Sequence, residues 1–360
     1  MSLAPDAVSA DPPLNVAVIG YGYWGPNLVR NTMESPELEL VAVCERDPER
    51  ISAFAARVRG VPVVRDVELV LRDPAIDAVI MATPPATHHP IALAALQAGK
   101  HVLVEKPLAT TSADVRSLMN AAEARDLVLM PGHTFLYSPP VIKVRELIQS
   151  GVLGEVYFVT SSRMNLGRYQ SEGVIWDLAP HDLSILLYWL GEPIVEVAAS
   201  VRTVFHEHVP ETAFLTLTFA SGAAANLQLS WLSPRKVREM LVVGSQRMVQ
   251  YEDTAADEAV RIFDRGMEFP PDESFGEYQL RYRTGDMVVP RLDALEPLSD
   301  ELSDFVQAVR TGRTPRSNTS LGLEVVLALE AAETSVGRRG EPVAVHGGGD
   351  IRRVTVAPGP

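Results

Sequence analysis

Two side chains suited to proton transfer, Asp177 and His181, stand four residues apart where a helix running to Leu190 is expected to open. That spacing lets them share one helix face or one tight loop. An imidazole can take a proton from an alcohol near neutral pH, and a carboxylate beside it orients the ring and stabilises its charged form. The alternative interpretation is structural, with Asp177 capping the helix and His181 packing.

A lysine follows the apolar run His101–Val104, within the tripeptide Glu105-Lys106-Pro107. Ligands of open α/β sheets lie beyond the carboxyl ends of strands, so Lys106 is expected to face a ligand there. Its ammonium could hydrogen-bond a substrate hydroxyl and favour the alkoxide. Pro107 pushes the lysine backbone toward an extended conformation. The alternative is an ordinary surface lysine.

A glycine-rich turn, Gly20-Tyr21-Gly22-Tyr23-Trp24-Gly25, follows the apolar residues Val16–Ile19 and precedes an expected helix. In this setting the first glycine permits the turn, the second lets a pyrophosphate approach and the third lets helix and strand pack closely. The helix N-terminus favours the phosphates. The pattern predicts a dinucleotide site, and a glycine turn that merely packs is the alternative.

The second expected strand ends at Glu45, where an acidic residue can accept hydrogen bonds from an adenosine ribose. Glu45 would repel a 2′-phosphate, which favours NAD over NADP. Arg46 offsets this preference, since it can stack on adenine or pair with a 2′-phosphate. A solvated loop pair is the alternative for both. Residues 82–88 form a rigid loop at the same sheet edge, suited to lining the cofactor, and we expect no catalytic role for His88.

The first third of the chain alternates apolar runs with helical stretches. Continuous apolar runs are typical of strands buried on both faces, and the strand–helix order predicts a parallel, doubly wound sheet. The expected strands are Asn15–Ile19, Leu38–Cys44, Val61–Val64, Ala78–Ala82, His101–Val104 and Val128–Pro131, and the expected helices are Asn27–Met33, Pro48–Arg59, Val67–Leu71, His89–Ala98 and Ser112–Arg125.

The sequence pattern changes after about Tyr137. Long stretches with strand-like composition now follow one another, joined by short connections. Short connections imply an antiparallel sheet, with Ser221-Gly222 as one hairpin turn. The expected strands are Glu155–Leu166, Ile194–Phe205, Thr212–Ala220, Ala223–Leu232 and Val237–Val243, and the expected helices are Pro140–Ser150, Ser299–Thr311 with Ser299 as N-cap, and Ser320–Arg338. The fold class is therefore α/β: a disordered tail at 1–13, a dinucleotide-binding doubly wound domain at 14–136, an α+β domain with a large open, mostly antiparallel sheet at 137–346, and a C-terminal tail at 347–360.

Composition excludes several classes of function. The 360 residues carry a net charge of -14, which repels nucleic-acid phosphates and anionic lipids. No apolar stretch is long enough to span a membrane. The single cysteine, Cys44, lies in an apolar run and fits a reducing, cytoplasmic compartment. Neither the Asp177–His181 cluster nor His206-Glu207-His208 completes a set of metal ligands, so no metal is expected.

Taken together, these motifs resemble the glucose–fructose oxidoreductase/inositol dehydrogenase (Gfo/Idh/MocA) family, from about Leu14 to Val345. The resemblance implies a Rossmann domain plus a domain whose open sheet forms homodimer or homotetramer interfaces. It implies that Lys106, Asp177 and His181 are catalytic, with His181 as acid/base, Lys106 orienting the reacting hydroxyl and Asp177 supporting the site. The positions that match its NAD(P)-binding pattern are Gly20, Gly22, Tyr23, Trp24, Gly25, Glu45, Arg46, Thr83, Pro84, His88, Glu105 and Lys106.

Three segments, 132–137, 163–167 and 175–182, are similar to the branch of that family that acts on nucleotide-linked sugars, such as 3-dehydrogenases. This likeness implies Arg163 and Asn165 as substrate-binding residues, beside Lys106 and His181. A structural polar pair on a strand is the alternative for both. Tyr169 and Trp176 either stack on the substrate or fill core.

Three functions remain open. The first is an NAD-dependent sugar dehydrogenase, with oxidation at C3 of a nucleotide-linked sugar. The second is an NADPH-dependent ketosugar or cyclitol enzyme of secondary metabolism. The third is a non-catalytic NAD-sensing regulator, against which the presence of Lys106, Asp177 and His181 argues, because a binding module has no need of all three.

Overall fold

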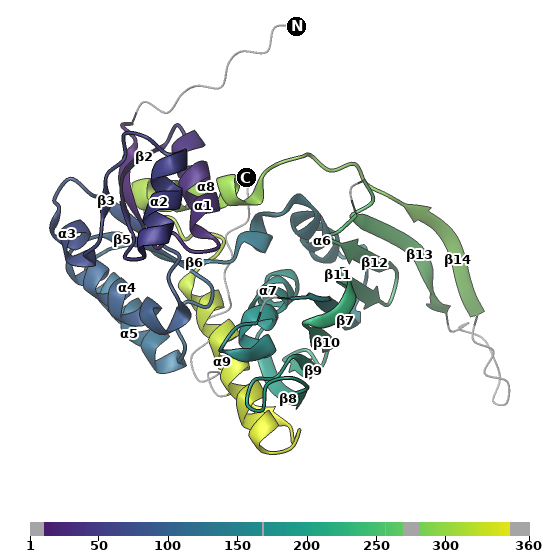
Figure 1. The fold of residues 1–360 in the computed structure, drawn as a ribbon. Helices are drawn as coiled ribbons and strands as arrows, with labels where there is room; N and C mark the ends of the chain where they lie inside the picture. Colours follow the sequence, from purple (N-terminus) through teal and green to yellow (C-terminus); the bar gives the residue numbers. More distant parts are fainter. Residues whose placement is uncertain (1–10, 168, 256, 269–280, 346–360) are drawn as a thin grey trace, which may run out of the picture. The chain divides into compact units, whose positions relative to one another are not determined.

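The structure, a computed structural model, describes residues 11–167, 169–255, 257–268 and 281–345. Most of the two expected tails, 1–13 and 347–360, therefore lies outside the described residues. The chain divides into two compact units (Figure 1). The first unit comprises Met1–Thr134 and Glu296–Thr319, and the second unit comprises Phe135–Leu295 and Ser320–Pro360.

The first unit is built on a six-stranded parallel sheet of order β3-β2-β1-β4-β5-β6. Helices α1, α2 and α8 cover one face and α4 and α5 the other (Figure 1). The doubly wound prediction is thus confirmed, because strands with apolar side chains on both faces need helices on both sides. The elements are β1 Leu14–Ile19, α1 Gly25–Glu34, β2 Leu38–Cys44, α2 Pro48–Arg57, β3 Val63–Val64, α3 Val67–Arg72, β4 Ala78–Met81, α4 His88–Gln97, β5 His101–Glu105, α5 Ser112–Glu123, β6 Leu129–Gly132 and α8 Pro297–Thr311.

Helix α8 returns to the first unit from a distant part of the sequence and packs against α1. Arg30 pairs with Glu296 just before α8, and Arg310 pairs with Glu37 at 3.3 Å. The sequence pattern did not reveal this discontinuity. It also placed the N-cap wrongly at Ser299: the helix begins at Pro297, because proline is pre-organised for the first helical position.

The second unit is built on a nine-stranded sheet of order β14-β13-β12-β11-β7-β10-β9-β8-β15, in which β7 and β10 are parallel and the other pairs antiparallel. This confirms the open, mostly antiparallel sheet. The strands are β7 Val156–Leu166, β8 Ile194–Arg202, β9 Thr212–Phe219, β10 Ala224–Ser230, β11 Leu232–Gly244, β12 Met248–Glu252, β13 Val260–Glu268, β14 Arg281–Val288 and β15 Val343–Ala344. The last four of these strands were not expected from the sequence.

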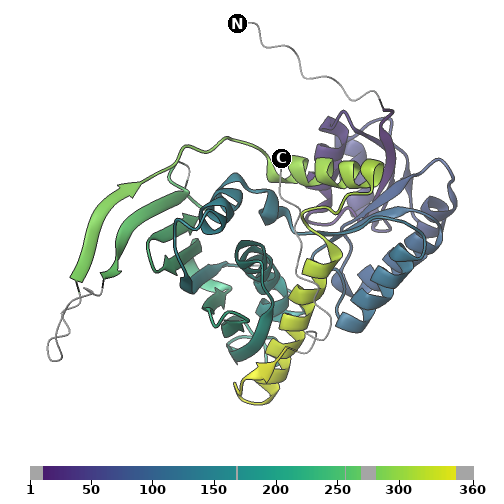
Figure 2. The ribbon, with the colours of Figure 1, turned by 180° about the vertical axis from the view of Figure 1, so that it is seen from behind.

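Helices α6 (Pro139–Gln149), α7 (Gly173–Leu190) and α9 (Thr319–Gly337) pack in this unit. Helix α7 contacts β9 and β10. Helix α9, yellow in Figure 2, is tied to β8 by Ser335 Oγ, which accepts from the Ala199 N–H at 2.8 Å. Helix α7 is buried through most of its length, so the side chains it still presents to solvent are few.

Candidate active site

The glycine-rich loop joins β1 to α1, and two of its glycines are required by the fold itself. Gly20 has a φ of 98°, and a Cβ there would lie 2.6 Å from the Ala82 carbonyl oxygen. A Cβ on Gly25 would overlap the Gly20 carbonyl oxygen. Any larger residue at either position would force the loop away from β4 or open the start of α1.

Gly22 is different, because the protein around it has room for a side chain. A Cβ there would meet only the Arg50 guanidinium, at 3.6 Å. Neither packing nor backbone conformation therefore demands glycine at this position. A pyrophosphate does demand it, since the phosphate oxygens must reach the loop backbone beside the N-terminus of α1. The residues present thus fit a dinucleotide.

Glu45, directly after β2, is buried and holds the loop by its carboxylate. Oε2 accepts from the Tyr21 N–H at 2.8 Å, and Oε1 accepts from the N–H groups of Arg46 and Asp47 at 2.8 and 3.0 Å. Burial alone would raise the pKa of Glu45, but these backbone hydrogen bonds outweigh it and lower the pKa. The carboxylate is therefore ionised, with three of its lone pairs occupied inside the protein.

The other residues predicted in the glycine-rich loop differ in exposure. Tyr23 is 78% exposed and Arg46 is also exposed, whereas Trp24 is half-buried with its indole N–H buried. Arg50 of α2 reaches back to 3.7 Å from the Glu45 carboxylate. The open side of the loop thus carries aromatic and cationic groups, which suit a dinucleotide.

The loop after β4 contains Thr83, Pro84 and His88. The Thr87 hydroxyl donates to Thr83 Oγ1 at 2.8 Å. His88 is fully buried, with Nδ1 2.7 Å from the Pro107 carbonyl oxygen and Nε2 2.9 Å from that of Thr83. Burial lowers the pKa of His88, although the two carbonyl oxygens raise it, and a neutral ring donates to only one of them at a time. Its role in this structure is to tie the β4 loop to the turn after β5.

That turn begins with Glu105, the last residue of β5, and continues into Lys106 and Pro107, joined by a cis peptide bond. Glu105 is half-buried, but its Oε1 is enclosed and has no hydrogen-bond partner within normal distance among the residues that the structure describes. Burial raises the pKa of Glu105 to about 7, although Lys106 lowers it. Lys106 thus stands at the carboxyl edge of the parallel sheet, where the sequence predicted it.

In the second unit, Asp177 and His181 lie one turn apart on one face of α7, which begins at Gly173. Asp177 is therefore inside the helix, and the capping alternative is wrong. Its Oδ2 accepts from the Trp231 indole N–H at 3.0 Å. The His181 ring packs edge-on against Phe135, with 5.1 Å between ring centroids. Both side chains are half-buried.

The predicted substrate-binding residues separate into two groups. Arg163 is buried in an ion pair with Asp182 at 2.6 Å, and the Trp176 indole donates to Glu333 at 2.6 Å. Both residues thus bind protein partners that the sequence did not indicate, and Arg163 Nη1 is buried with no partner among the described residues. Asn165 is half-buried, and Tyr169 is 49% exposed and stacks on His206 at 4.1 Å between centroids.

Several residues that matter for the site were missed. Trp231 and Phe135 position the α7 pair, and their aromatic types alone gave no sign of it. Glu301 and His133 are fully buried polar groups in the first unit, with Glu301 accepting from the Thr134 hydroxyl at 2.7 Å. A charged residue on the apolar face of α8 was the available signal for Glu301, since glutamate is seldom fully buried.

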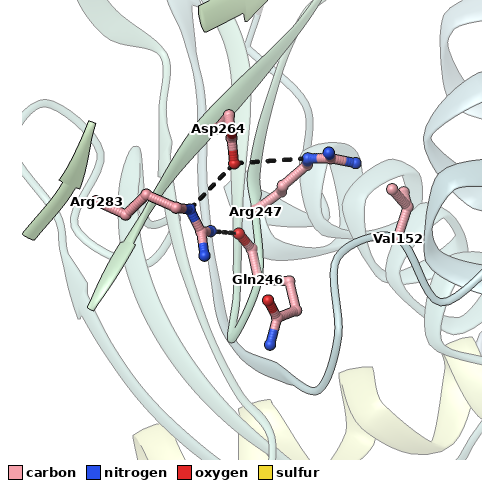
Figure 3. A pocket seen from close by; sticks show the side chains of 5 residues that line it. All are labelled: Val152, Gln246, Arg247, Asp264 and Arg283. Atoms are coloured by element: carbon pink, nitrogen blue, oxygen red, sulfur yellow. Dashed lines mark hydrogen bonds and ion pairs between the residues drawn. The ribbon is translucent and has the colours of Figure 1, made fainter. Parts of the chain in front are cut away.

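A pocket of about 330 Å³ lies elsewhere in the second unit, beside β12, β13 and β14. Figure 3 shows its charged side chains directed at one another: Arg283 and Arg247 approach Asp264 at 3.1 and 3.7 Å. Arg283 also donates to the Gln246 carbonyl oxygen. Its lining residues include none of the predicted site residues, and its charges are already paired.

The described parts of the chain contain no cluster of three or more potential metal-ligating side chains. Within the same residues, no helix has the length and apolar character needed to cross a bilayer.

The fold and the glycine-rich loop define a class: a protein with a Rossmann-type dinucleotide-binding domain. Comparison with family models agrees, since residues 14–133 match the model described as "Oxidoreductase family, NAD-binding Rossmann fold" and residues 141–250 match that of the GFO/IDH/MocA C-terminal domain. The chain belongs to the GFO/IDH/MocA family of oxidoreductases. The predicted family, cofactor NAD(P) and enzyme class, a dehydrogenase or reductase of this family, are thereby confirmed.

Individual relatives are more distant. A dTDP-3,4-didehydro-2,6-dideoxy-alpha-D-glucose 3-reductase from Saccharopolyspora spinosa is 31% identical over 225 residues, which cover 60% of this chain and 68% of the relative. The crystal structure of GenD2 from gentamicin A biosynthesis in complex with NAD is 26% identical, with a TM-score of 0.80 over 96% of this chain and 100% of that one. The UDP-N-acetylglucosamine 3-dehydrogenase GnnA from Acidithiobacillus ferrooxidans is 25% identical, with a TM-score of 0.74 over 90% and 98% of the two chains.

Proposed function

We propose that this protein moves a hydride between nicotinamide and a secondary alcohol or ketone carbon of a nucleotide-linked sugar, at C3. The observation that carries the proposal is the Asp177–His181 pair on one face of α7, with Asp177 held by the Trp231 indole. Two of the relatives add support, because their names describe 3-reduction of a dTDP-sugar and 3-dehydrogenation of a UDP-sugar.

The bound nicotinamide supplies the hydride acceptor or donor, and the protein supplies the proton chemistry. His181 takes the hydroxyl proton in oxidation and returns it in reduction. Asp177 orients the imidazole and stabilises its charged form. Lys106 donates a hydrogen bond to the reacting oxygen and favours its alkoxide by charge. Half-exposed Tyr169 and half-buried Asn165 are the substrate contacts, whereas Arg163 and Trp176 act by holding the second unit together.

A second candidate is an NADPH-dependent ketosugar reductase, and the environment of Glu45 favours it. Three backbone N–H groups already occupy the Glu45 carboxylate, so its repulsion of a 2′-phosphate is weaker than that of a free carboxylate. Exposed Arg46 is available to pair with that phosphate. A fluorescence titration with NAD and with NADP separates the two candidates: tighter binding of NADP supports the reductase, and tighter binding of NAD supports the dehydrogenase.

We further propose a cytoplasmic homodimer or homotetramer assembled through the sheet of the second unit. Large apolar side chains on its strands remain exposed, among them Tyr157 at 52%, Phe158 at 41% and Phe214 at 40%. Exposed apolar surface on one sheet favours association. Light scattering of the purified protein would reveal a mass two or four times 39.2 kDa, and a monomer mass would contradict the proposal.

The substrate assignment is tested by following NADH formation with UDP- and dTDP-sugars, free sugars and cyclitols. Turnover is expected with a nucleotide-linked sugar and is expected to fall at least about a hundredfold in His181→Ala, the scale of lost acid–base help. Replacing the exposed loop residue His208 by alanine is the matched control and should leave turnover unchanged. Turnover of a cyclitol alone would contradict the nucleotide-sugar assignment while leaving the hydride chemistry intact.

A further inference from the structure

Strand β11 departs from regular pairing at the segment Ser233–Lys236, the β11 bulge. Its register against β7 shifts there, so the whole segment lies opposite the single residue Asn165. The Ser233 hydroxyl donates to the Arg235 carbonyl oxygen at 2.8 Å and accepts from the Arg235 N–H at 3.3 Å. Bulges are frequent beside active sites, where they redirect side chains. The β11 bulge is therefore a hydrogen-bonded turn that can present side chains to a ligand.

The residues on either side of the β11 bulge reach the surroundings of the α7 pair, within the second unit. Before the bulge, the Trp231 indole donates to Asp177 at 3.0 Å. After the bulge, the Arg238 guanidinium lies 5.7 Å from the centroid of the Phe135 ring. That ring packs against the His181 imidazole, with 5.1 Å between centroids. The β11 bulge thus borders the two residues proposed to handle the proton.

The β11 bulge carries two adjacent cations in a protein whose net charge is -14. Arg235 and Lys236 are exposed, and neither forms an ion pair with a residue that the structure describes. Arg238, by contrast, is paired with Asp253 at 2.8 Å. Arginine binds phosphate through its planar fork and lysine binds it as a point charge. A local pair of cations of this kind is what an anionic group needs to approach an acidic protein.

An aromatic side chain lies on the other side of Trp231. Tyr169 is 6.3 Å from Trp231 and 4.1 Å from His206 between ring centroids, and His206 Nδ1 is 3.1 Å from the Glu211 carboxylate. Gly167 makes room for this arrangement, since a Cβ there would lie 2.6 Å from the Trp231 ring. Tyr169 is therefore supported by protein, while 49% of it stays exposed to a planar partner.

We propose that these elements bind the nucleoside diphosphate of the substrate, with the base stacked on Tyr169 and the diphosphate bound by Arg235 and Lys236. The inference rests on the proposed function and adds which residues hold the part of the substrate that does not react. Stacking on an aromatic ring accepts any base, so it suits UDP- and dTDP-sugars alike. Trp231 contacts both Tyr169 and Asp177, which places the two elements beside the end of α7 where the sugar reacts.

The test is the binding of UDP, UMP, dTDP and dTMP to the NAD-saturated protein, measured by calorimetry. Saturating NAD occupies the dinucleotide site, so the probes report on the remaining site. Replacing Arg235→Ala together with Lys236→Ala should weaken diphosphate binding at least about tenfold, the scale of lost hydrogen bonds to charged groups. Monophosphate binding should weaken less. Arg338→Ala, which removes an exposed cation just after α9, is the matched control and should bind like the wild-type protein.

Tyr169 is tested separately, because base stacking does not depend on the number of phosphates. Tyr169→Ala should weaken diphosphate and monophosphate binding alike, by at least about fivefold, whereas Tyr169→Phe should keep the wild-type affinity. With a nucleotide-linked sugar, the double variant of the bulge should raise KM more than it lowers kcat, since the diphosphate is held equally before and during hydride transfer.

Wild-type affinity for UDP and dTDP in the double variant would overturn the proposal, as would equal weakening of diphosphate and monophosphate binding. Turnover of a nucleotide-linked sugar with an unchanged KM in the double variant would also overturn it, while leaving the proposed function intact. If the wild-type protein neither binds a nucleoside diphosphate nor turns over a nucleotide-linked sugar, the proposed substrate class itself is contradicted.

Discussion

Two glutamates end strands of the same parallel sheet, and their surroundings give them opposite charge behaviour. Glu45, after β2, accepts hydrogen bonds from three backbone N–H groups, and its pKa is lowered. Glu105, at the end of β5, has an oxygen without a partner, and its pKa is raised to about 7. Burial therefore does not set the charge of a carboxyl by itself. The hydrogen-bond donors around the carboxyl matter as well: three backbone N–H groups favour the ionised form of Glu45, whereas Glu105 keeps one oxygen without a partner.

The largest effect is expected at the anchor. Glu45→Ala leaves the buried N–H group of Tyr21 and the partly buried N–H groups of Arg46 and Asp47 without their acceptor. The free energy of unfolding should fall by about 3 to 5 kcal/mol, because each unpaired buried donor costs about 1–3 kcal/mol and water can reach some of them. Urea titration at pH 7 measures the loss. A loss below about 1 kcal/mol would show that the loop does not depend on Glu45.

Glu45 also gives the stability a pH dependence of known sign. Its pKa is lower in the folded protein than the ordinary 4.5, so its stabilisation is complete above that value and is lost as the pH falls below it. The difference in unfolding free energy between the wild-type protein and Glu45→Gln should therefore shrink in acid. A difference that stays constant from neutral pH into acid would contradict the ionised, hydrogen-bonded state.

The next effect has the opposite sign and concerns Glu105. Its folded pKa of about 7 exceeds the ordinary 4.5, so the folded state loses stability as the pH rises from 4.5 through 7. Glu105→Gln removes this penalty and should raise the unfolding free energy at pH 8 by at most about 3 kcal/mol, at 1.36 kcal/mol per pKa unit. The same variant should show little gain at pH 4.5. A destabilised Glu105→Gln at pH 8 would mean that the carboxylate is better satisfied than its contacts indicate.

The smallest effect tests the hydrogen bond to Glu301. Thr134→Val removes the hydroxyl that donates to Glu301 Oε2 while preserving the volume of the side chain. The expected loss is about 1 kcal/mol of unfolding free energy, the net contribution of one neutral hydrogen bond. Thermal unfolding at pH 7 measures it, with Thr254→Val at an exposed loop position as the control.

The sequence predicted what repeats regularly and missed what depends on tertiary pairing. The Rossmann strands were predictable because apolar runs alternate with helices and the glycine turn marks the start of α1. Strand β13 was missed because its charged residues, Arg261, Asp264 and Arg265, obscure the alternation typical of a strand. The return of α8 to the first unit was invisible, since the ion pairs that hold it join residues about 270 positions apart.

The site shows the same division between local and tertiary information. Residue types and spacing predicted the Asp177–His181 face, Lys106 and the glycine loop. They did not predict the buried ion pair between Arg163 and Asp182, because this pairing joins a strand to a helix. Nor did they predict that the Glu45 carboxylate accepts hydrogen bonds from backbone N–H groups, because these bonds depend on the path of a loop. Charge and size are local properties, whereas the partners of a buried polar group are not.

Lys106→Met and His181→Ala separate cofactor binding from turnover when NAD affinity and the rate of NADH formation are measured on the same preparations. We expect NAD affinity within a few-fold of the wild-type value and a turnover reduced at least about a hundredfold in both variants. Wild-type turnover in both variants would contradict the assignment of the proton chemistry to these two side chains.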